Sequence, residues 1–168
     1  MRNINRGTEQ GVKIKYQVSA VGVIHTPFAT KEKAPIQGNF HPEAVGTVEV
    51  SAEFTEGLLD IELFSHLVLL YHFDRANDVE LVRHPFLDDT PHGIFATRHP
   101  CRPNGIGLSI VKLLRREGNL LHVSGIDVLD GTPLLDIKPY VTRFDCIPEA
   151  SEGWFAGKEK REKPPGRE

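Results

Sequence analysis

Two arginines, Arg98 and Arg102, lie in a stretch that is rich in proline, asparagine and glycine. Residues 98–107 connect a short apolar run, 94–97, to a longer one, 108–114. Proline fixes φ, whereas asparagine and glycine tolerate positive φ, so we expect a stiff connection whose backbone can approach a ligand. The forked donors of a guanidinium suit a carboxylate or another anion. The pattern therefore predicts a site for an anionic small molecule, and the alternative is a tight hairpin connection with surface arginines.

A second polar segment, residues 127–140, contains three aspartates. Asp130-Gly131-Thr132-Pro133 has the composition of a turn, in which we expect the aspartate to bond the backbone ahead of it. As pure structure, the turn indicates a hairpin between strands at 121–129 and 134–137. A hard-cation site at Asp127, Asp130 and Asp136 is the other interpretation, but their spacing follows no calcium-loop pattern.

The eight histidines are dispersed, and no two have H-x-x-x-H or H-x-H spacing. We interpret them as hydrogen-bonded core or surface residues and predict no metal site, with a metal-dependent hydrolase as the alternative. The sequence has no nucleophile elbow, no Walker loop and no strand-borne G-x-G-x-x-G. Any nucleotide-like cofactor is therefore expected to bind outside the Rossmann framework.

The bulk composition is that of an ordinary globular protein. The chain has 168 residues and a formal net charge of -3, so RNA binding would need a local basic patch or a second subunit. The two cysteines share no close spacing, which suits a reducing compartment. No apolar run approaches the roughly 20 residues of a membrane span, and we expect a cytoplasmic protein without membrane association.

The elements that position these residues are expected to be strands. Fifteen glycines and twelve prolines leave few windows for a long helix. A short helix is predicted at 54–64, and 66–73 is predicted as a strand covered on both faces. The other strand candidates are 14–18 continuing into 21–24, 45–50, 93–97, 108–114, 120–128 and 134–137.

This pattern predicts a mainly β fold, a small single-domain β-barrel with short helical segments, because closure removes exposed sheet edges. We expect the barrel domain at 14–156, an N-terminal tail at 1–13, and a charged disordered tail at 157–168. A solvated tail is the simple interpretation, and RNA contact by its small positive excess is the alternative.

Five segments, in the same order, resemble the TsaA-like (TrmO, YaeB) family over about residues 18–145. They are Gly22-Val-Ile-His-Thr-Pro-Phe28, Phe64-Ser-His-Leu67, Ile94-Phe-Ala-Thr-Arg98, Arg102-Pro-Asn-Gly-Ile-Gly-Leu-Ser109 and Asp130-Gly-Thr-Pro-Leu-Leu-Asp-Ile-Lys-Pro-Tyr140. The resemblance implies a β-barrel that binds S-adenosylmethionine at a homodimer interface. It further implies methyl transfer to N6 of threonylcarbamoyladenosine, at position 37 in the tRNA anticodon loop.

The resemblance also assigns residues. The implied cofactor site comprises Pro35, Ile36, Gln37, Asp74, Arg75, Arg98, Leu108, Asp130, Gly131, Thr132 and Pro133. Contacts to the tRNA substrate are expected from Arg102, Asn104, Lys138 and Tyr140. A proton acceptor is needed because N6 is a poor nucleophile, and Asp130, Asp136 and His66 are the candidates, among which the sequence does not choose.

Three departures from the family pattern lie near the implied pocket and bear on cofactor affinity. Gly105 stands where the family usually has proline, Ile36 where it has arginine, and Asp74-Arg75 where many members have His-Gln. Bacterial members also carry a C-terminal extension, whereas the body of this chain is expected to stop near Phe155. A second functional hypothesis is therefore a cofactor-binding module without transferase activity, such as a sensor or an assembly partner.

Overall fold

The computed structural model describes residues 15–35, 37–38 and 41–158. Its barrel strands are β1 (Gly22–His25), β2 (Val45–Val50), β3 (His66–His72), β6 (Ile106–Glu117), β7 (Leu120–Ser124) and β8 (Thr132–Pro139). Two short strands, β4 (Val82–Arg83) and β5 (His92–Gly93), form a separate sheet. The helices are short: 3-10 helices η2 (Ala52–Leu58), η3 (Ile61–Leu63), η4 (Ile94–Ala96), η5 (Pro103–Gly105) and η6 (Gly153–Phe155), and α1 (Thr142–Asp145).

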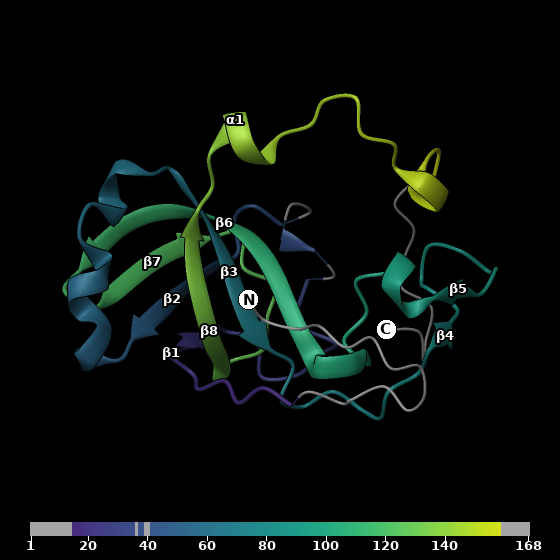
Figure 1. Cartoon of the computed structure of the whole chain (residues 1–168), viewed down its shortest axis with the longest axis horizontal. Helices are drawn as coiled ribbons and strands as arrows, with labels where there is room; N and C mark the ends of the chain where they lie inside the picture. Colours follow the sequence, from purple (N-terminus) through teal and green to yellow (C-terminus); the bar gives the residue numbers. More distant parts are fainter. Residues whose placement is uncertain (1–14, 36, 39–40, 159–168) are drawn as a thin grey trace, which may run out of the picture.

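Within the described residues, six antiparallel strands close into a barrel in the order β1-β2-β7-β6-β3-β8. Closure comes from β1 and β8, where Gly22 pairs with Leu134 and Ile24 with Thr132. Figure 1 shows the barrel on one side of the molecule and the β4–β5 sheet on the other. The prediction of a mainly β, barrel-shaped fold is confirmed.

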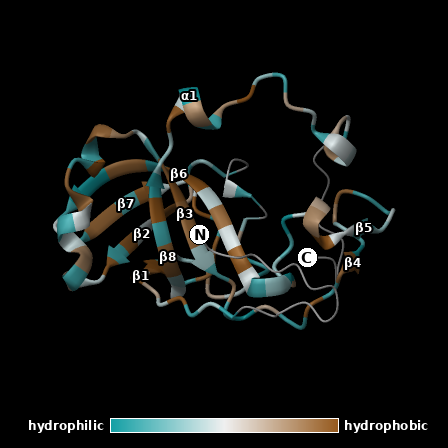
Figure 2. Cartoon of the chain, in the orientation of Figure 1, coloured by the Kyte–Doolittle hydropathy of each residue, from teal (hydrophilic) through white to brown (hydrophobic). Residues whose placement is uncertain are grey.

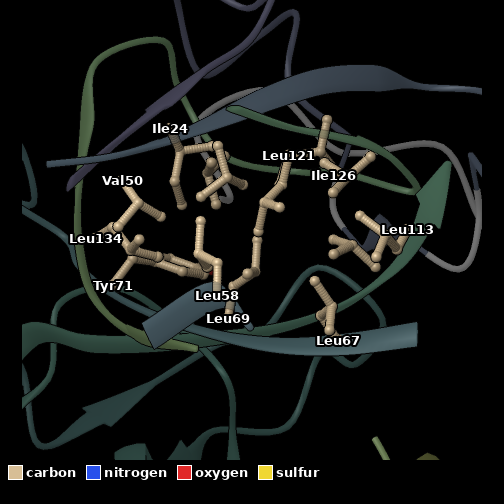
Figure 3. Close-up of a cluster of buried hydrophobic side chains, with 14 residues drawn as sticks. Ile24, Val50, Leu58, Leu67, Leu69, Tyr71, Leu113, Leu121, Ile126 and Leu134 are labelled. Atoms are coloured by element: carbon tan, nitrogen blue, oxygen red, sulfur yellow. The ribbon is translucent and has the colours of Figure 1, made fainter. Parts of the chain in front are cut away.

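The core fills the barrel interior because alternate residues of each strand face inward. β6 shows this alternation from Ile106 to Leu114, where Val111 and Leu113 are buried while Ile110 and Leu114 are exposed. Bands of contrasting hydropathy along β6 are visible in Figure 2. Figure 3 shows the inward side chains converging, with Leu58 of η2 packed among them. The helical segment thus caps the core formed by the strands.

The chain after the barrel packs against the β4–β5 sheet. Trp154 in η6 stacks on His92 of β5 with ring centroids 4.3 Å apart, and its indole N–H donates to the carbonyl of Ala96 at 2.7 Å. Further along, Lys158 Nζ lies 2.9 Å from Asp88 Oδ2. These contacts join the segment around η6 to the part of the molecule beside the barrel.

Several predicted elements differ from the structure. Residues 15–18 are not in a strand, and the predicted strand at 93–97 is a 3-10 helix after Gly93. The predicted helix at 54–64 is instead two 3-10 helices, η2 and η3. β3 is fully buried on one face and only partly covered on the other. The predicted N-terminal tail at 1–13 lies outside the described residues, as does Ile14. Of the predicted tail at 157–168, residues 159–168 lie outside them, whereas Gly157 and Lys158 are described, with Lys158 in an ion pair with Asp88.

The predicted hairpin at Asp130–Pro133 is also wrong. β7 pairs with β2 and β6, whereas β8 pairs with β1 and β3, so the two strands flanking this turn are not partners. The turn therefore connects two different parts of the barrel wall.

No helix in the described part of the chain is long and apolar enough to cross a membrane.

Candidate functional site

A cavity of about 1000 Å³ lies between the barrel and the β4–β5 sheet. Its barrel side is lined by Tyr71 and Phe73 at the end of β3, by residues 106–108 of β6, and by residues 127–129. Residues 29–32, 34–35 and Gln37 form another part of the wall, and residues 97–102 form a further part. The arginine-bearing connection expected from the sequence thus borders a cavity rather than a simple hairpin.

Arg75 ties the first loop after β3 to the Asp130 turn. Its Nη1 donates to the carbonyl of Asp130 at 2.8 Å and its Nη2 to Thr132 Oγ1 at 3.1 Å. Thr132 Oγ1 in turn donates to the carbonyl of Leu129 at 2.7 Å. Arg75, at a position where the family pattern has glutamine, therefore holds the turn beside the cavity with two hydrogen bonds.

The Asp130 side chain does not bond its own turn as expected. Its Oδ1 accepts from the backbone N–H of Thr26 at 3.0 Å, just after β1. The backbone N–H of Asp130 donates to the carbonyl of Phe28 at 2.9 Å. These contacts fix the turn to the start of the 26–35 loop, so two cavity walls are held together by one residue.

Arg98 and Arg102 both line the cavity. Arg98 Nη1 donates to Gln37 Oε1 at 3.3 Å, which joins the 97–102 segment to the loop on the other side of the cavity. Arg102 Nη1 donates to the carbonyl of Thr97 at 3.0 Å and so braces its own segment. Arg98 is exposed at the cavity wall, and its positive charge faces whatever occupies the space.

A carboxylate, Asp127, lies at the base of this wall and also lines a small adjoining cavity beside Arg98. Its Oδ1 accepts from Ser109 Oγ and its Oδ2 from the backbone N–H of Gly38 at 2.8 Å. Ser109 is also bonded to the hydroxyl of Tyr71, with 3.0 Å between the oxygens. Asp127 therefore links β6, β3 and the 29–38 loop in one buried network.

Burial shifts the pKa values of this network. Desolvation raises the pKa of Asp127 above its ordinary value, although the hydrogen bonds from Ser109 and Gly38 oppose the change. Burial also raises the pKa of the Tyr71 hydroxyl far above its ordinary value, and the negative charge of Asp127 adds to this effect. The tyrosine is therefore a neutral donor or acceptor, and Asp127 is the group in the network that can exchange a proton.

The 29–38 loop is docked by a close backbone approach at Gly38. A Cβ atom at this position would lie 1.9 Å from the carbonyl oxygen of Gly125, which no side chain can tolerate. Together with the hydrogen bond to Asp127, this contact fixes the end of the loop that carries Pro35 and Gln37.

Gly105 takes a positive φ of 57°, next to Asn104 with φ of 68°. Proline, whose ring holds φ near −65°, cannot adopt this conformation. The backbone of η5 at this departure from the family pattern therefore requires a residue other than proline.

The structure brings part of the expected cofactor set together. Around the large cavity lie Pro35, Gln37, Asp74, Arg75, Arg98, Leu108 and Thr132. Asp130, Gly131 and Pro133 belong to the adjoining turn rather than to the cavity lining, and Ile36 lies outside the described residues.

The expected substrate and catalytic residues are more scattered. Arg102 lines the cavity, whereas Asn104, Lys138 and Tyr140 are not among the lining residues. Asp136 forms an ion pair with Lys138 at 2.7 Å. His66, at the start of β3, contacts Ser65 and packs edge-on against Tyr140. Neither His66 nor Asp136 lines the cavity.

Sequence reasoning missed Asp127, Ser109 and Tyr71 as a connected group. Asp127 was considered only with Asp130 and Asp136 as a cation site, and the described residues contain no group of three or more metal-ligating side chains. One sequence signal does point to a buried carboxylate here, because Asp127 directly precedes the apolar pair Val128-Leu129.

A closed barrel with a cavity lined by arginines beside it is an architecture suited to binding a small ligand. Residues 23–146 match the family described as tRNA-methyltransferase O N-terminal domain. The chain belongs to this family, which confirms the resemblance read from the five motifs.

Three relatives illustrate the similarity. A protein of Pyrococcus abyssi named "Probable S-adenosyl-L-methionine-binding protein" is 52% identical over 135 residues, covering 80% of this chain and 73% of its own. The crystal structure of TrmO from Pseudomonas aeruginosa superposes with a TM-score of 0.71 at 41% identity, covering 83% of this chain and 62% of that chain. The human tRNA (adenine(37)-N6)-methyltransferase is 34% identical over 132 residues, covering 74% of this chain and 30% of the human protein.

Proposed function

We propose that this protein is an S-adenosylmethionine-dependent methyltransferase that acts on N6 of threonylcarbamoyladenosine at tRNA position 37. The observation that carries the proposal is the cavity, because in a chain of this family seven of the eleven expected cofactor residues line one space beside the barrel. Relatives named as S-adenosylmethionine-binding proteins and as a tRNA methyltransferase support the cofactor and the acceptor, respectively.

The residues around the cavity fit the proposed cofactor. Arg98 offers a guanidinium for the carboxylate of a methionine moiety, and Asp127 offers a negative charge near a sulfonium. Leu108, Pro35 and Phe73 give apolar surface for an adenosine moiety. Bound S-adenosylmethionine supplies a methyl group on a positively charged sulfur, and its transfer to nitrogen leaves a neutral thioether.

The chain's own part in the reaction is mainly positioning, because the methyl group is already activated. Arg75 fixes the Asp130 turn, and Asp127 fixes the 29–38 loop, so the walls are set before a ligand binds. Such preorganisation reduces the ordering that binding would otherwise require.

A proton must also leave N6 when the new bond forms. Asp127 lines the cavity and has a raised pKa, which makes its carboxylate a stronger base than an exposed aspartate. We therefore propose Asp127 as the acceptor, with Asp130 as the candidate from the sequence whose turn adjoins the cavity. His66 and Asp136 would require a conformation that brings them to the cavity.

We further propose that two copies associate and that the protein acts in the cytoplasm, where its tRNA substrate is found. The support for a second copy is an exposed apolar face on β6, formed by Ile106, Leu108, Ile110 and Leu114. Leu108 and Ile106 also line the cavity, so a partner covering this face would adjoin the proposed cofactor site.

The test is methyl transfer from radiolabelled S-adenosylmethionine to purified tRNA. We expect label in tRNA that carries threonylcarbamoyladenosine and none in tRNA from cells that lack this modification. Nucleoside digestion should place the label on N6 of the modified adenosine. Cofactor binding without label in either tRNA would reject the transferase proposal and favour the binding module, which several relatives named only for cofactor binding also suggest.

A further inference from the structure

The part of the cavity wall contributed by η6 and the residues after β4 is aromatic. Phe86, Trp154 and Phe155 line it. Trp154 is stacked with His92 and also with Phe155, whose ring centroid is 3.8 Å away at an interplanar angle of 25°. The hydrogen bond from its indole N–H to Ala96 fixes the stack in place. Phe155 is the exposed member, with 39% of its surface accessible.

Two cations line the same cavity as these rings. Arg83 and Arg102 line the same cavity, and each is oriented by a neighbour within its own segment. Arg83 Nη1 lies 3.2 Å from Glu80 Oε1, and Arg102 is bonded to the carbonyl of Thr97. Aromatic rings beside arginines form the usual combination that binds single-stranded nucleic acid, by stacking on bases and pairing with phosphates.

The cavity is large for a small-molecule site, and the proposed cofactor residues belong to only part of its wall. Pockets for one small molecule have volumes of roughly 300–1000 Å³, and this cavity, at about 1000 Å³, is at the upper end. The proposed cofactor residues Arg75, Arg98 and Thr132 belong to the loops at the barrel, whereas Phe155 belongs to η6 beside the β4–β5 sheet.

We infer that Phe155, backed by Trp154, is the stacking platform for the acceptor purine base of an RNA, with Arg83 and Arg102 placed for the adjacent phosphates. This inference rests on the proposed function, and it assigns the RNA base to the part of the cavity that the proposed cofactor residues do not line. A base in a single-stranded loop can be turned out onto such a platform at small cost, because it has no pairing partner to lose.

The first experiment uses the chain's single tryptophan, which is Trp154. The whole chain, saturated with S-adenosylhomocysteine, is titrated with an anticodon stem–loop RNA containing threonylcarbamoyladenosine at the acceptor position. Binding is followed in parallel by the anisotropy of a label on the RNA. We expect this RNA to quench Trp154 fluorescence in a saturable way. The same RNA with an abasic acceptor position should still bind but should not quench the fluorescence. RNA binding without any change in fluorescence would overturn the inference.

The second experiment compares Phe155→Ala with Phe155→Tyr, which keeps a ring, and with Phe144→Ala as a matched control. Phe144 is exposed on α1 and does not line the cavity. We expect Phe155→Ala to weaken binding of the stem–loop RNA about tenfold and to raise KM for tRNA similarly. Phe155→Tyr and Phe144→Ala should resemble the unsubstituted protein, and calorimetric affinity for S-adenosylmethionine should stay unchanged in all three.

The outcomes separate this inference from the proposed function. Loss of S-adenosylmethionine affinity in Phe155→Ala, with RNA binding unchanged, would mean that the platform holds the cofactor's own adenine and would overturn the inference. If the unsubstituted protein methylates tRNA and Phe155→Ala binds RNA equally well, the stacking inference would be overturned, whereas the proposed function would stand. Base-dependent quenching in a protein that transfers no methyl group would support the platform and reject the transferase activity.

Discussion

At the scale of single residues, the cavity depends on where three charges are held. Arg98 is exposed at the wall and anchored to Gln37, Arg75 is committed to the Asp130 turn, and Asp127 is partly buried between Ser109 and Gly38. Arg98 is thus the cation placed to meet a ligand, whereas Arg75 and Asp127 also hold the walls in position.

Replacing Arg98 with alanine should weaken S-adenosylmethionine binding by about 1.5–3 kcal/mol, the contribution of a hydrogen bond to a charged group. Isothermal titration calorimetry measures the change directly. Arg143→Ala is the matched control, because Arg143 is exposed on α1 and does not line the cavity. Equal affinities in all three proteins would place the ligand's carboxylate elsewhere.

Asp127 should make stability depend on pH. Because burial raises its pKa in the folded state, the protonated form is favoured by folding. That contribution is complete below the unfolded pKa of about 3.9 and is lost as pH rises through the folded pKa. The free energy of unfolding of the unsubstituted protein, minus that of Asp127→Asn, should therefore fall as pH rises above about 4, over the range in which Asp127 titrates. Urea unfolding of both proteins across this range tests it, and a difference that rises with pH would show that folding favours the carboxylate.

The sequence motifs lead to Arg98, Gln37 and Thr132, and the structure places all three around the cavity. The Asp127 network could not be predicted, because it joins residues from β6, β3 and the 29–38 loop that are distant in the sequence. Phe155 and Trp154 were also missed, as their position depends on how the segment after α1 returns to the β4–β5 sheet.

At the scale of elements, the loops that form the cavity are held by backbone contacts. The 29–38 loop ends where Gly38 meets the carbonyl of Gly125, and the Asp130 turn is bonded to residues just after β1. The loop geometry is therefore part of the barrel's own packing.

Gly38→Ala should force this loop away from Gly125 and lower the free energy of unfolding by about 1–3 kcal/mol, as overpacking does. Affinity for S-adenosylmethionine should fall with it, because Pro35 and Gln37 would move. Thermal unfolding and calorimetry give the two values. Gly57→Ala serves as the control, since a Cβ there would meet nothing within 4 Å. An unchanged Gly38→Ala protein would mean that the loop is not docked at this point.

Strand periodicity predicted most of the barrel wall but not how its strands pair. The candidates at 45–50 and 108–114 are both strands of the barrel, and each buries one face. The run at 93–97 does not form a strand with one buried face. Phe95 is 76% exposed, and residues 94–96 form a 3-10 helix beside the barrel. Local turn composition predicts a hairpin at Asp130, but it does not reveal that β7 and β8 belong to separate pairs.

At the scale of the whole molecule, the outer face of β6 leaves apolar side chains exposed beside the cavity. Ile106, Leu108, Ile110 and Leu114 are each between 37% and 49% exposed. Exposed apolar side chains that share one face of a strand are typical of an interaction site, and on this face the exposed Lys112 lies between Ile110 and Leu114. A second copy covering it would also limit the access of water to the cavity.

Ile110→Glu should therefore convert a dimer into monomers, because a charge would be buried at the interface. Sedimentation equilibrium provides the measurement. Leu63→Glu is the control, since Leu63 on η3 is 80% exposed and lies outside this face. An unsubstituted protein that sediments as a monomer at all concentrations would contradict the proposed association.

The central claim is that the cavity between the barrel and the β4–β5 sheet holds S-adenosylmethionine. The most direct measurement is a crystal structure grown with excess S-adenosylmethionine. The ligand is expected in this cavity, with its carboxylate bonded to Arg98 and its adenosine against Leu108 and the Thr132 side of the Asp130 turn. Ligand bound on another surface, with Arg98 and Thr132 in contact with solvent alone, would contradict the account.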